Sequence, residues 1–234
     1  MYWDYHTHSA YSADSRAALG DMVAAAQRRG LKEYCFTDHY EPDYPHLDLV
    51  DFTIDIPAYA AGVDEFIAAY TGPVRLKRGL EVGLMPDIMP RVAQELRAYD
   101  WDFLIASNHL IGGKDPYFKQ FFQGMTLQQR YTTYLTELLA ALRTFDFYSV
   151  VGHLTYAQRW HGEIPYADCA DLTDAILRHV IHTGHGIEVN TSSIAGRGAP
   201  MPGWDFLKRY KELGGEILTM GSDAHQPQQV AREF

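Results

Sequence analysis

The sequence predicts an α/β protein in which seven parallel strands, separated mostly by helices, close into a barrel. Apolar runs of strand length alternate with helical patterns along the chain, and this alternation is typical of a parallel sheet. A chain of 234 residues is long enough for one such domain. Polar or metal-binding side chains follow each predicted strand, and in a parallel barrel those strand ends share one face.

The strands are predicted from short apolar or aromatic runs bounded by turn residues. They are expected at residues 2–5, 33–37, 74–82, 102–107, 147–151, 186–190 and 216–220. Residues 102–107 are almost continuously apolar, as in a strand that is covered on both faces. This composition favours a parallel sheet.

Helices are predicted between these strands from the helical spacing of apolar residues. They are expected at residues 19–29, 58–70, 87–99, 126–143, 169–183 and 203–213. Gly30 and Gly184 would end two of them, and Thr126 would cap the amino terminus of a third. The segments 40–57 and 110–125 are predicted as loops.

The composition excludes several classes of function. The net charge of -10 argues against binding to nucleic acid or to an anionic membrane, which would need a basic surface. The two cysteines, Cys35 and Cys169, lie far apart in the sequence, which fits a reducing cytoplasm. We see no signal peptide and no apolar run near the roughly 20 residues that span a bilayer. We therefore expect a cytoplasmic protein with a small-molecule substrate, and the sequence indicates no particular oligomeric state.

Two histidines directly after the first predicted strand, His6 and His8, begin a candidate metal site. Side chains two apart in a strand point the same way, so both would reach one spot beyond the strand end. With 11 histidines in the chain, such a pair arises easily by chance. Its meaning depends on the residues that follow the other strands.

Six of the 11 histidines follow predicted strands, and three carboxylates lie at or soon after strand ends. The nine residues are His6, His8, Asp14, His39, Glu81, His109, His153, Asp223 and His225. Taken singly, each has an ordinary structural explanation, such as a turn residue for Asp14 or a helix cap for Asp223. Taken together, nine ligands exceed the usual four of one ion, so the set suits two or three divalent ions. Such ligands accept Zn²⁺, Mn²⁺ or Fe²⁺.

The order of these motifs closely resembles that of the PHP (polymerase and histidinol phosphatase) superfamily. The matching segments are His6-Thr7-His8-Ser9, Asp14, Thr37-Asp38-His39, Gly79-Leu80-Glu81-Val82-Gly83, Ser107-Asn108-His109, Gly152-His153 and Gly221-Ser222-Asp223-Ala224-His225. Within the superfamily, the chain is most similar to the histidinol-phosphate phosphatases. That similarity extends to Ile111-Gly112-Gly113, Gln158-Arg159-Trp160 and Asn190-Thr191-Ser192.

The resemblance implies a distorted (β/α)7 TIM-like barrel with a trinuclear metal centre. The first ion would be held by His6, His8, Glu81 and Asp223, the second by Glu81, His109 and His153, and the third by Asp14, His39 and His225. Many relatives have a histidine in place of Asp14, and a carboxylate there favours a harder ion or weaker occupancy of the third site. We assign a catalytic role to the bridging Glu81 and to Asp223.

The implied reaction is hydrolysis of a phosphate monoester, L-histidinol phosphate, by a hydroxide that bridges two ions. Arg159 and Arg197, in predicted loops, are candidates to bind the phosphate oxygens. Tyr117 is a candidate to close over the substrate. For all three, an exposed surface residue is the ordinary alternative. Asp38 or a metal-bound water could donate the proton that the leaving group needs.

Three other functions are compatible with the same residues. A phosphoesterase of this type could act on another small phosphate ester, such as a nucleotide. An amidohydrolase-type barrel also begins with two spaced histidines, but such barrels bridge their metals through a lysine, and Lys77 lies too early in its strand. The third alternative is a metal-binding protein without catalytic activity. We expect one domain over residues 1–234, short or truncated after His225, with poor cover near the first strand.

Overall fold

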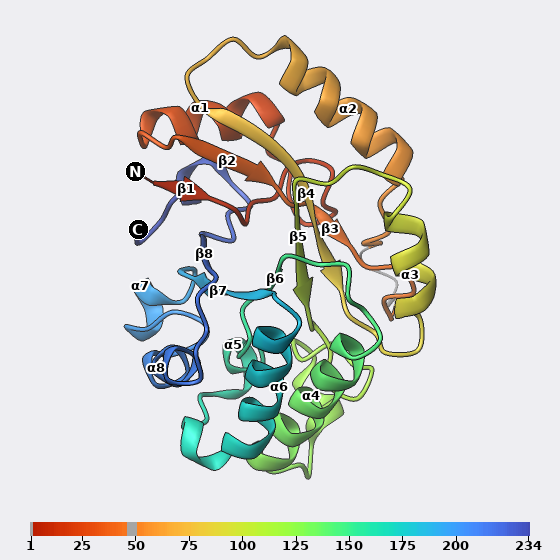
Figure 1. Cartoon of the computed structure of the whole chain (residues 1–234), viewed down its shortest axis with the longest axis vertical. Coiled ribbons are helices and arrows are strands. Elements are labelled where there is room, and N and C mark those ends of the chain that lie inside the picture. Colours follow the sequence, from red (N-terminus) through yellow and green to blue (C-terminus); the bar gives the residue numbers. More distant parts are fainter. Residues whose placement is uncertain (1, 46–50) are drawn as a thin grey trace.

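The computed structural model describes residues 2–45 and 51–234 and shows a nearly closed barrel of parallel strands with helices around it (Figure 1). The strands follow one another in the hydrogen-bonded order β1-β2-β4-β5-β6-β7-β8. Their bounds are β1 Trp3–Asp4, β2 Glu33–Phe36, β4 Arg75–Gly83, β5 Phe103–Ser107, β6 Val150–Val151, β7 Gly186–Asn190 and β8 Leu218–Gly221. Each neighbouring pair in this path is parallel. The predicted distorted (β/α)7 barrel is confirmed.

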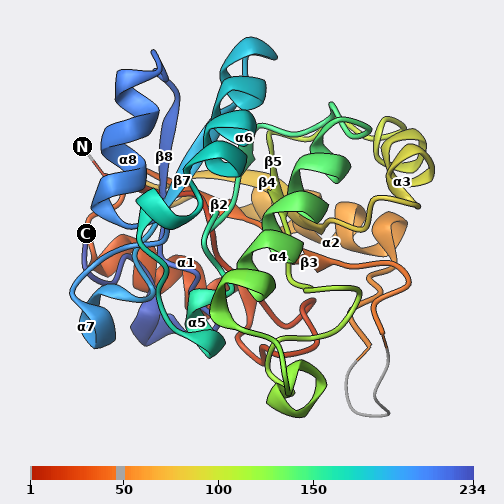
Figure 2. The ribbon, with the colours of Figure 1, turned by 90° about the horizontal axis from the view of Figure 1, so that it is seen from below.

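The helices join the strands and cover the outside of the barrel (Figures 1 and 2). They are α1 Leu19–Arg28, α2 Ile56–Ala69, α3 Met89–Leu96, α4 Leu127–Leu142, α5 Gln158–His161, α6 Ala170–His182, α7 Ile194–Arg197 and α8 Trp204–Glu212, with the 3-10 helices η1 Lys119–Phe122, η2 Tyr166–Asp168 and η3 Pro227–Gln229. Gly30 follows α1 with a φ of 73°, a conformation that favours glycine. The Thr126 side chain caps α4 by accepting from the Gln129 backbone N–H. None of the described helices is long and apolar enough to cross a membrane.

Several predicted loops contain short elements. Residues 158–161 and 194–197 form the single-turn helices α5 and α7, and η1 lies within the predicted loop 110–125. One turn is too short to show a helical period in the sequence, which is why these helices were not predicted. In the predicted loop 40–57, residues 46–50 lie outside the described residues.

An additional strand, β3 (His39–Tyr40), continues the line of β2 along the long strand β4. Strand β4 is nine residues long, so its first part pairs with β2 and its later part with β3. In this register His39 lies opposite Glu81. The short strand therefore brings one of the six predicted histidines beside the central predicted carboxylate.

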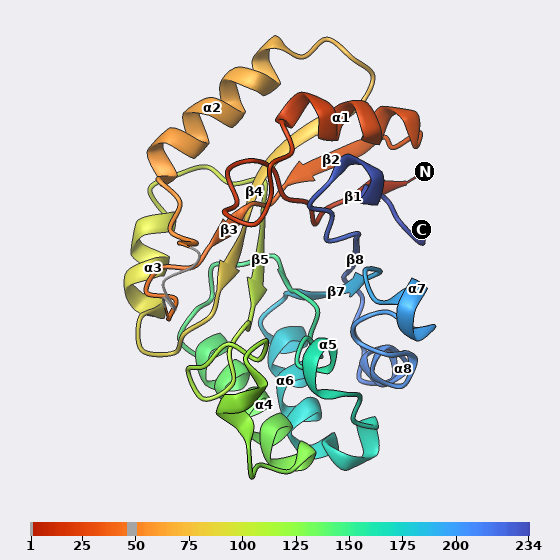
Figure 3. The ribbon, with the colours of Figure 1, turned by 180° about the vertical axis from the view of Figure 1, so that it is seen from behind.

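The barrel closes where β1 meets the segment that contains β8 (Figure 3). The Tyr5 backbone N–H donates to the Met220 carbonyl at 3.1 Å, and the Asp223 N–H donates to the His6 carbonyl at 2.9 Å. The buried Asp4 carboxylate accepts from the backbone N–H groups of Ser222 and Ala231, each at 2.9 Å. These bonds hold residues 222–231 against the first strand, and so place Asp223 beside the two histidines that follow β1.

The apolar core lies mainly between the strands and their helices. Tyr34 and Phe36 of β2 point outward into this core, together with residues of α1, α2, α4 and α6. A smaller cluster inside the barrel contains Cys35, Phe103, Ile105 and Val150, as the alternation of side chains along a strand requires. Cover is sparse near the closure, where Leu218 of β8 is 50% exposed.

Candidate metal centre

Glu81 lies at the centre of the carboxyl-terminal face of the barrel and is fully buried. It comes from the later part of β4, where the strand is buried on both sides. Its Oε2 atom lies 3.2 Å from His6 Nε2, 3.5 Å from His8 Nε2 and 3.0 Å from His39 Nδ1. One oxygen of this carboxylate therefore faces three imidazoles.

The other oxygen of Glu81 faces a different pair of histidines. Oε1 lies 2.8 Å from His153 Nε2 and 3.2 Å from His109 Nε2, and the two Nε2 atoms are 3.3 Å apart. A carboxylate with separate groups of imidazoles at its two oxygens has the arrangement of a ligand that bridges two cations.

Asp223, directly after β8, adds a second carboxylate to the group around His6 and His8. Its Oδ1 atom lies 3.5 Å from His8 Nε2 and 3.9 Å from His6 Nε2. Its Oδ2 atom accepts from Arg159 Nη2 at 2.5 Å. The residue has a positive φ of 53°, which is tolerated better by aspartate than by most residues. The four residues predicted for the first ion thus lie together.

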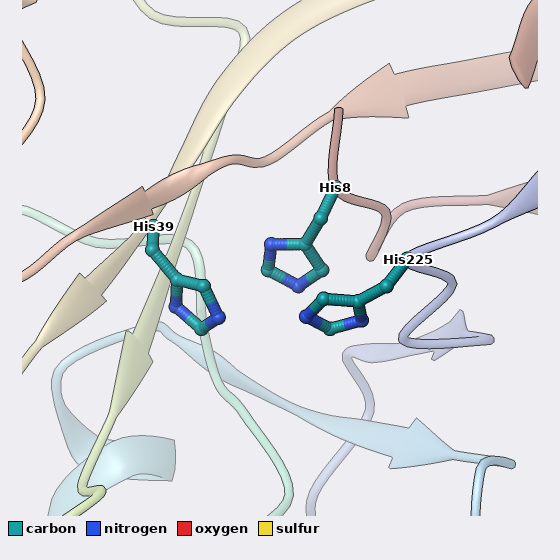
Figure 4. A group of neighbouring side chains, drawn as sticks. All are labelled: His8, His39 and His225. Carbon is teal, nitrogen blue, oxygen red and sulfur yellow. The ribbon is translucent and has the colours of Figure 1, made fainter. Parts of the chain in front are cut away.

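The three residues predicted for the third ion also lie together. Asp14 Oδ2 is 3.1 Å from His225 Nε2 and 3.6 Å from His39 Nε2. Figure 4 shows His8 between His39 and His225, with the three rings gathered at one spot. The His8 ring stacks on both neighbours, with centroids 4.3 Å and 4.0 Å away. Asp14 is the most exposed carboxylate of the group, at 37% of its side chain.

The donor atoms of this group fit metal ions. Buried polar atoms normally have hydrogen-bond partners, but many atoms here have none among the described residues. They include His6 Nε2, His8 Nε2 and both oxygens of Glu81. Overlapping groups of three histidines and carboxylates in this site have their ligand atoms within 4.8 Å of one another. Cations would satisfy these atoms and balance the buried carboxylates.

Burial and neighbouring charges set the ionisation of the group. Burial alone would raise the pKa of Glu81, but His6, His109 and His39 outweigh it and hold that pKa well below its ordinary value. Burial would lower the pKa of His109, but Glu41 and Glu81 raise it to about 9. Without metal, imidazolium groups therefore compensate the carboxylates, and a cation must displace their protons to bind.

Glu188 on β7 contacts two of the predicted metal-binding histidines, His6 and His153. Its position in the sequence did not reveal this role. The sequence showed a carboxylate at a strand end, but not that it faces an imidazole. Its Oε1 atom accepts from His6 Nδ1 at 2.6 Å, and its Oε2 atom accepts from the His153 backbone N–H at 2.8 Å. A carboxylate on Nδ1 leaves Nε2 free to bind a cation. Gly221 leaves room for it, since a Cβ there would overlap Glu188 Oε1.

Glu41, directly after β3, is a second carboxylate that the sequence did not single out. Its Oε1 atom lies 2.8 Å from His109 Nδ1 and 3.2 Å from His39 Nδ1. Burial would raise the pKa of Glu41, but the two imidazoles lower it to about 2. Glu41 therefore links a histidine predicted for the second ion to one predicted for the third.

Asp38 lies behind the metal-binding group and not at the substrate side, so the structure does not support it as a proton donor. It is fully buried and accepts from the backbone N–H groups of Ser9 and Ser12 at 2.6 and 3.1 Å, and from the Ser12 hydroxyl at 2.8 Å. The Ser12 oxygen in turn accepts from the His39 N–H at 3.0 Å and lies 3.2 Å from His8 Nδ1. Asp38 thus fixes the loop that orients His8.

Two cavities open onto the group. One, of about 500 Å³, contains the side chains of Glu81, Asp14 and the surrounding histidines, and its aromatic wall includes Tyr117. Tyr117 is 58% exposed and packs edge-on against Trp160. The other cavity, of about 590 Å³, is lined by Arg159 and Arg197. All three side chains predicted to contact substrate therefore line a cavity beside the group, with the two arginines on α5 and α7 and not in loops.

A parallel barrel with imidazoles and carboxylates gathered at the carboxyl ends of its strands defines the class of metal-binding α/β barrels. The comparisons with known proteins identify the family within this class. The chain belongs to the PHP domain family, whose model matches residues 4–192.

Known relatives resemble almost the whole chain. A histidinol-phosphatase of Lactococcus lactis is 30% identical over 227 residues, which cover 95% of this chain and 83% of the relative. The crystal structure of the Lactococcus lactis histidinol phosphate phosphatase, complexed with zinc, L-histidinol and phosphate, has a TM-score of 0.87 at 30% identity and covers 96% of this chain and 86% of that one. A "Probable histidinol-phosphatase" of Clostridium acetobutylicum is 26% identical over 100% of this chain and 90% of the relative.

Proposed function

We propose that the protein is a metal-dependent phosphomonoesterase that hydrolyses L-histidinol phosphate to L-histidinol and phosphate. The observation that supports this most strongly is Glu81, whose two oxygens face separate groups of imidazoles beside an arginine-lined cavity. The similarity to a histidinol-phosphatase whose structure contains zinc, L-histidinol and phosphate supports the choice of substrate.

Two or three divalent ions, Zn²⁺, Mn²⁺ or Fe²⁺, would be held by the nine predicted residues. The proposed sets are His6, His8, Glu81 and Asp223; Glu81, His109 and His153; and Asp14, His39 and His225. Ions held there supply a Lewis acid and lower the pKa of a water molecule towards neutrality. Glu188 and Glu41 orient the histidines by contacts to their Nδ1 atoms.

The charged side chains beside the proposed ion sites match a phosphate group. Arg159 is held by Asp223 Oδ2 at 2.5 Å and by the Ser192 hydroxyl at 2.9 Å, so its guanidinium is already oriented. Arg197 donates to the Arg159 carbonyl at 3.2 Å. Both would bind phosphoryl oxygens and stabilise the charge that develops on them.

The cavity around Glu81 suits a leaving group that is aromatic and carries positive charge, as histidinol does. Its walls include Tyr44, Tyr156 and Trp160, together with the carboxylates of Glu41 and Asp115. Aromatic faces and carboxylates attract an amine or an imidazolium. Tyr117, at the rim, would pack over the bound substrate.

Removing the central carboxylate tests the mechanism. We expect Glu81→Ala to lower phosphate release from L-histidinol phosphate by more than about 100-fold, because the proposed bridge between two ions is lost, and changes to groups that only support the ligands already cost about 10–100-fold. Phosphate release from the metal-loaded protein measures this. Glu216→Gln, at an exposed residue before β8, is the control and should leave the rate unchanged.

An undiminished rate in Glu81→Ala would contradict the mechanism. A wild-type protein that releases phosphate from nucleotides but not from L-histidinol phosphate would contradict the substrate and leave the mechanism in place.

A further inference from the structure

The arginine-lined cavity contains a third arginine that comes from outside the predicted site. This cavity, of about 590 Å³, is lined by Arg159, Ser192, Ser193, Gly196, Arg197, Asp223, His225, Gln229 and Arg232. It shares Arg159, Asp223 and His225 with the cavity around Glu81. The two cavities are therefore neighbouring parts of one site.

The lining of this cavity is strongly positive although the chain as a whole carries a net charge of -10. Asp223 is the one carboxylate among the lining residues, and it already contacts Arg159 and three histidines. Arg197 lies 3.8 Å from Glu163, whose side chain is 56% exposed, so that contact compensates its charge only weakly. Cations concentrated in this way attract an anion.

Arg232 is held in a fixed position by the backbone. Its Nε donates to the Ser222 carbonyl at 2.8 Å, and its Nη2 donates to the Asp223 carbonyl at 3.0 Å. Its own carbonyl accepts from the Thr191 hydroxyl at 2.7 Å. Bonds to neutral carbonyls orient the guanidinium without compensating its charge, and a guanidinium has five N–H groups.

Within residues 2–45 and 51–234, no ion pair includes Arg232. A half-buried, oriented cation without a carboxylate partner is suited to a ligand oxygen. Arg159, by contrast, is already paired with Asp223. The free charge in the cavity therefore comes mainly from Arg232 and Arg197.

We propose that Arg232 binds the phosphate group of the substrate and of the product, as the third arginine of an anion-binding cavity beside the metal centre. This inference rests on the proposed phosphatase function for the substrate, but binding of inorganic phosphate to the cavity follows from its charge and shape alone. Arg232 then contributes to the affinity for phosphate, and it also holds the backbone of Ser222 and Asp223.

The test compares Arg232→Met, Arg232→Lys and the control Arg178→Met, which removes a charge from the exposed face of α6. We expect Arg232→Met to weaken binding of inorganic phosphate to the metal-loaded protein by roughly tenfold or more, since a charged hydrogen bond is lost. KM for L-histidinol phosphate should rise by a similar factor, with a smaller change in kcat. Arg232→Lys should recover part of the affinity, and Arg178→Met should match the wild type. Calorimetry with phosphate and initial rates give these quantities, and thermal melting reports the stability of each variant.

A purely structural role would lower stability or kcat in Arg232→Met while phosphate affinity stayed at the wild-type value, and this result would overturn the inference. If Arg232→Met does not fold, Arg232→Gln decides, because the amide keeps N–H donors for the backbone carbonyls but has no charge: unchanged phosphate affinity and KM overturn the inference, and a loss of both supports it. The wild-type protein could bind phosphate through Arg232 and yet not cleave L-histidinol phosphate. That result would support the anion site and contradict only the proposed substrate.

Discussion

At the scale of single residues, the carboxylate of Glu188 connects two parts of the proposed metal centre. One oxygen contacts the His6 ring and the other contacts the backbone of His153. His6 belongs to the set proposed for the first ion and His153 to the set proposed for the second. A change at Glu188 should therefore affect both ions, although it binds neither in the proposed arrangement.

We expect Glu188→Gln to lower the affinity for metal by about 10–100-fold, the usual effect of losing a group that supports a metal ligand. The amide keeps the size of the side chain but has one acceptor oxygen in place of two, so either the His6 contact or the His153 contact is lost. Competition with a metal-binding dye measures the affinity. Glu216→Gln serves as the control, and equal affinities of the two variants would show that Glu188 does not support the centre.

The sequence predicted nine residues that the structure gathers, because each follows a strand and carries a side chain typical of metal sites. It did not predict the roles of Glu41 and Glu188, since a carboxylate at a strand end could face a cation, an imidazole or solvent. For the same reason, the sequence left Asp38 as one of two candidate proton donors, a role that its buried position does not support. What such a carboxylate faces depends on the side chains of the neighbouring strands. The sequence alone does not show which side chains those are.

At the scale of secondary-structure elements, the ends of the strands must pack closely so that the ligands can converge. Gly221 ends β8 at a point where a Cβ would overlap both the His6 Cβ and Glu188 Oε1. Gly152, directly after β6, has a similar constraint, because a Cβ there would overlap the Ser107 hydroxyl. These glycines allow neighbouring strands to place their side chains in a common space.

We expect Gly221→Ala to lower the free energy of unfolding by about 1–3 kcal/mol, because the added methyl must displace buried groups, and to weaken metal binding as His6 and Glu188 move. Urea denaturation of the metal-free protein measures the first effect. Gly20→Ala in α1 is the matched control, since its Cβ would meet Phe66 at an ordinary 3.9 Å and alanine favours a helix by up to about 1 kcal/mol. Equal stability of the two variants would contradict the packing argument.

Long elements were predictable because their hydrophobic periods extend over several turns. Helices α1, α4 and α6 begin and end within a residue or two of the predicted positions. Three short elements were not predicted: β3 has two residues, and α5 and α7 have four each. Yet β3 presents His39 to Glu81, and α5 and α7 present Arg159 and Arg197. The least predictable elements thus position much of the site.

At the scale of the whole molecule, the barrel gathers charge from most of its strands into one buried place. Burial lowers the pKa of each imidazole, and neighbouring carboxylates raise it. The carboxylates have the larger effect at His6, His39 and His109, whose pKa values are raised. The overall barrel was predictable from the alternation of elements. Its closure through Asp4, by contrast, depends on contacts between residues far apart in the sequence, which no local pattern indicates.

We expect binding of Zn²⁺ or Mn²⁺ to the metal-free protein to release protons near neutral pH. The pKa of His109 is about 9 without metal, so this imidazole is protonated at neutral pH and must lose its proton to bind a cation. Metal affinity should therefore rise as the pH increases towards 9. Calorimetric titrations in two buffers with different ionisation enthalpies measure the released protons, and identical heats in both buffers would contradict the expectation.

The pairing of the first strand with the segment after β8 also determines when the metal-binding residues can meet during synthesis. Glu81, His109 and His153 are all present soon after the ribosome has made β6. His6 and His8 must wait for Asp223 and His225, which follow β8, and such distant contacts form slowly. In a nascent chain, His6 and His8 therefore lack Asp223 and His225 until all eight strands have been made. The complete centre can form only after β8 has been synthesised.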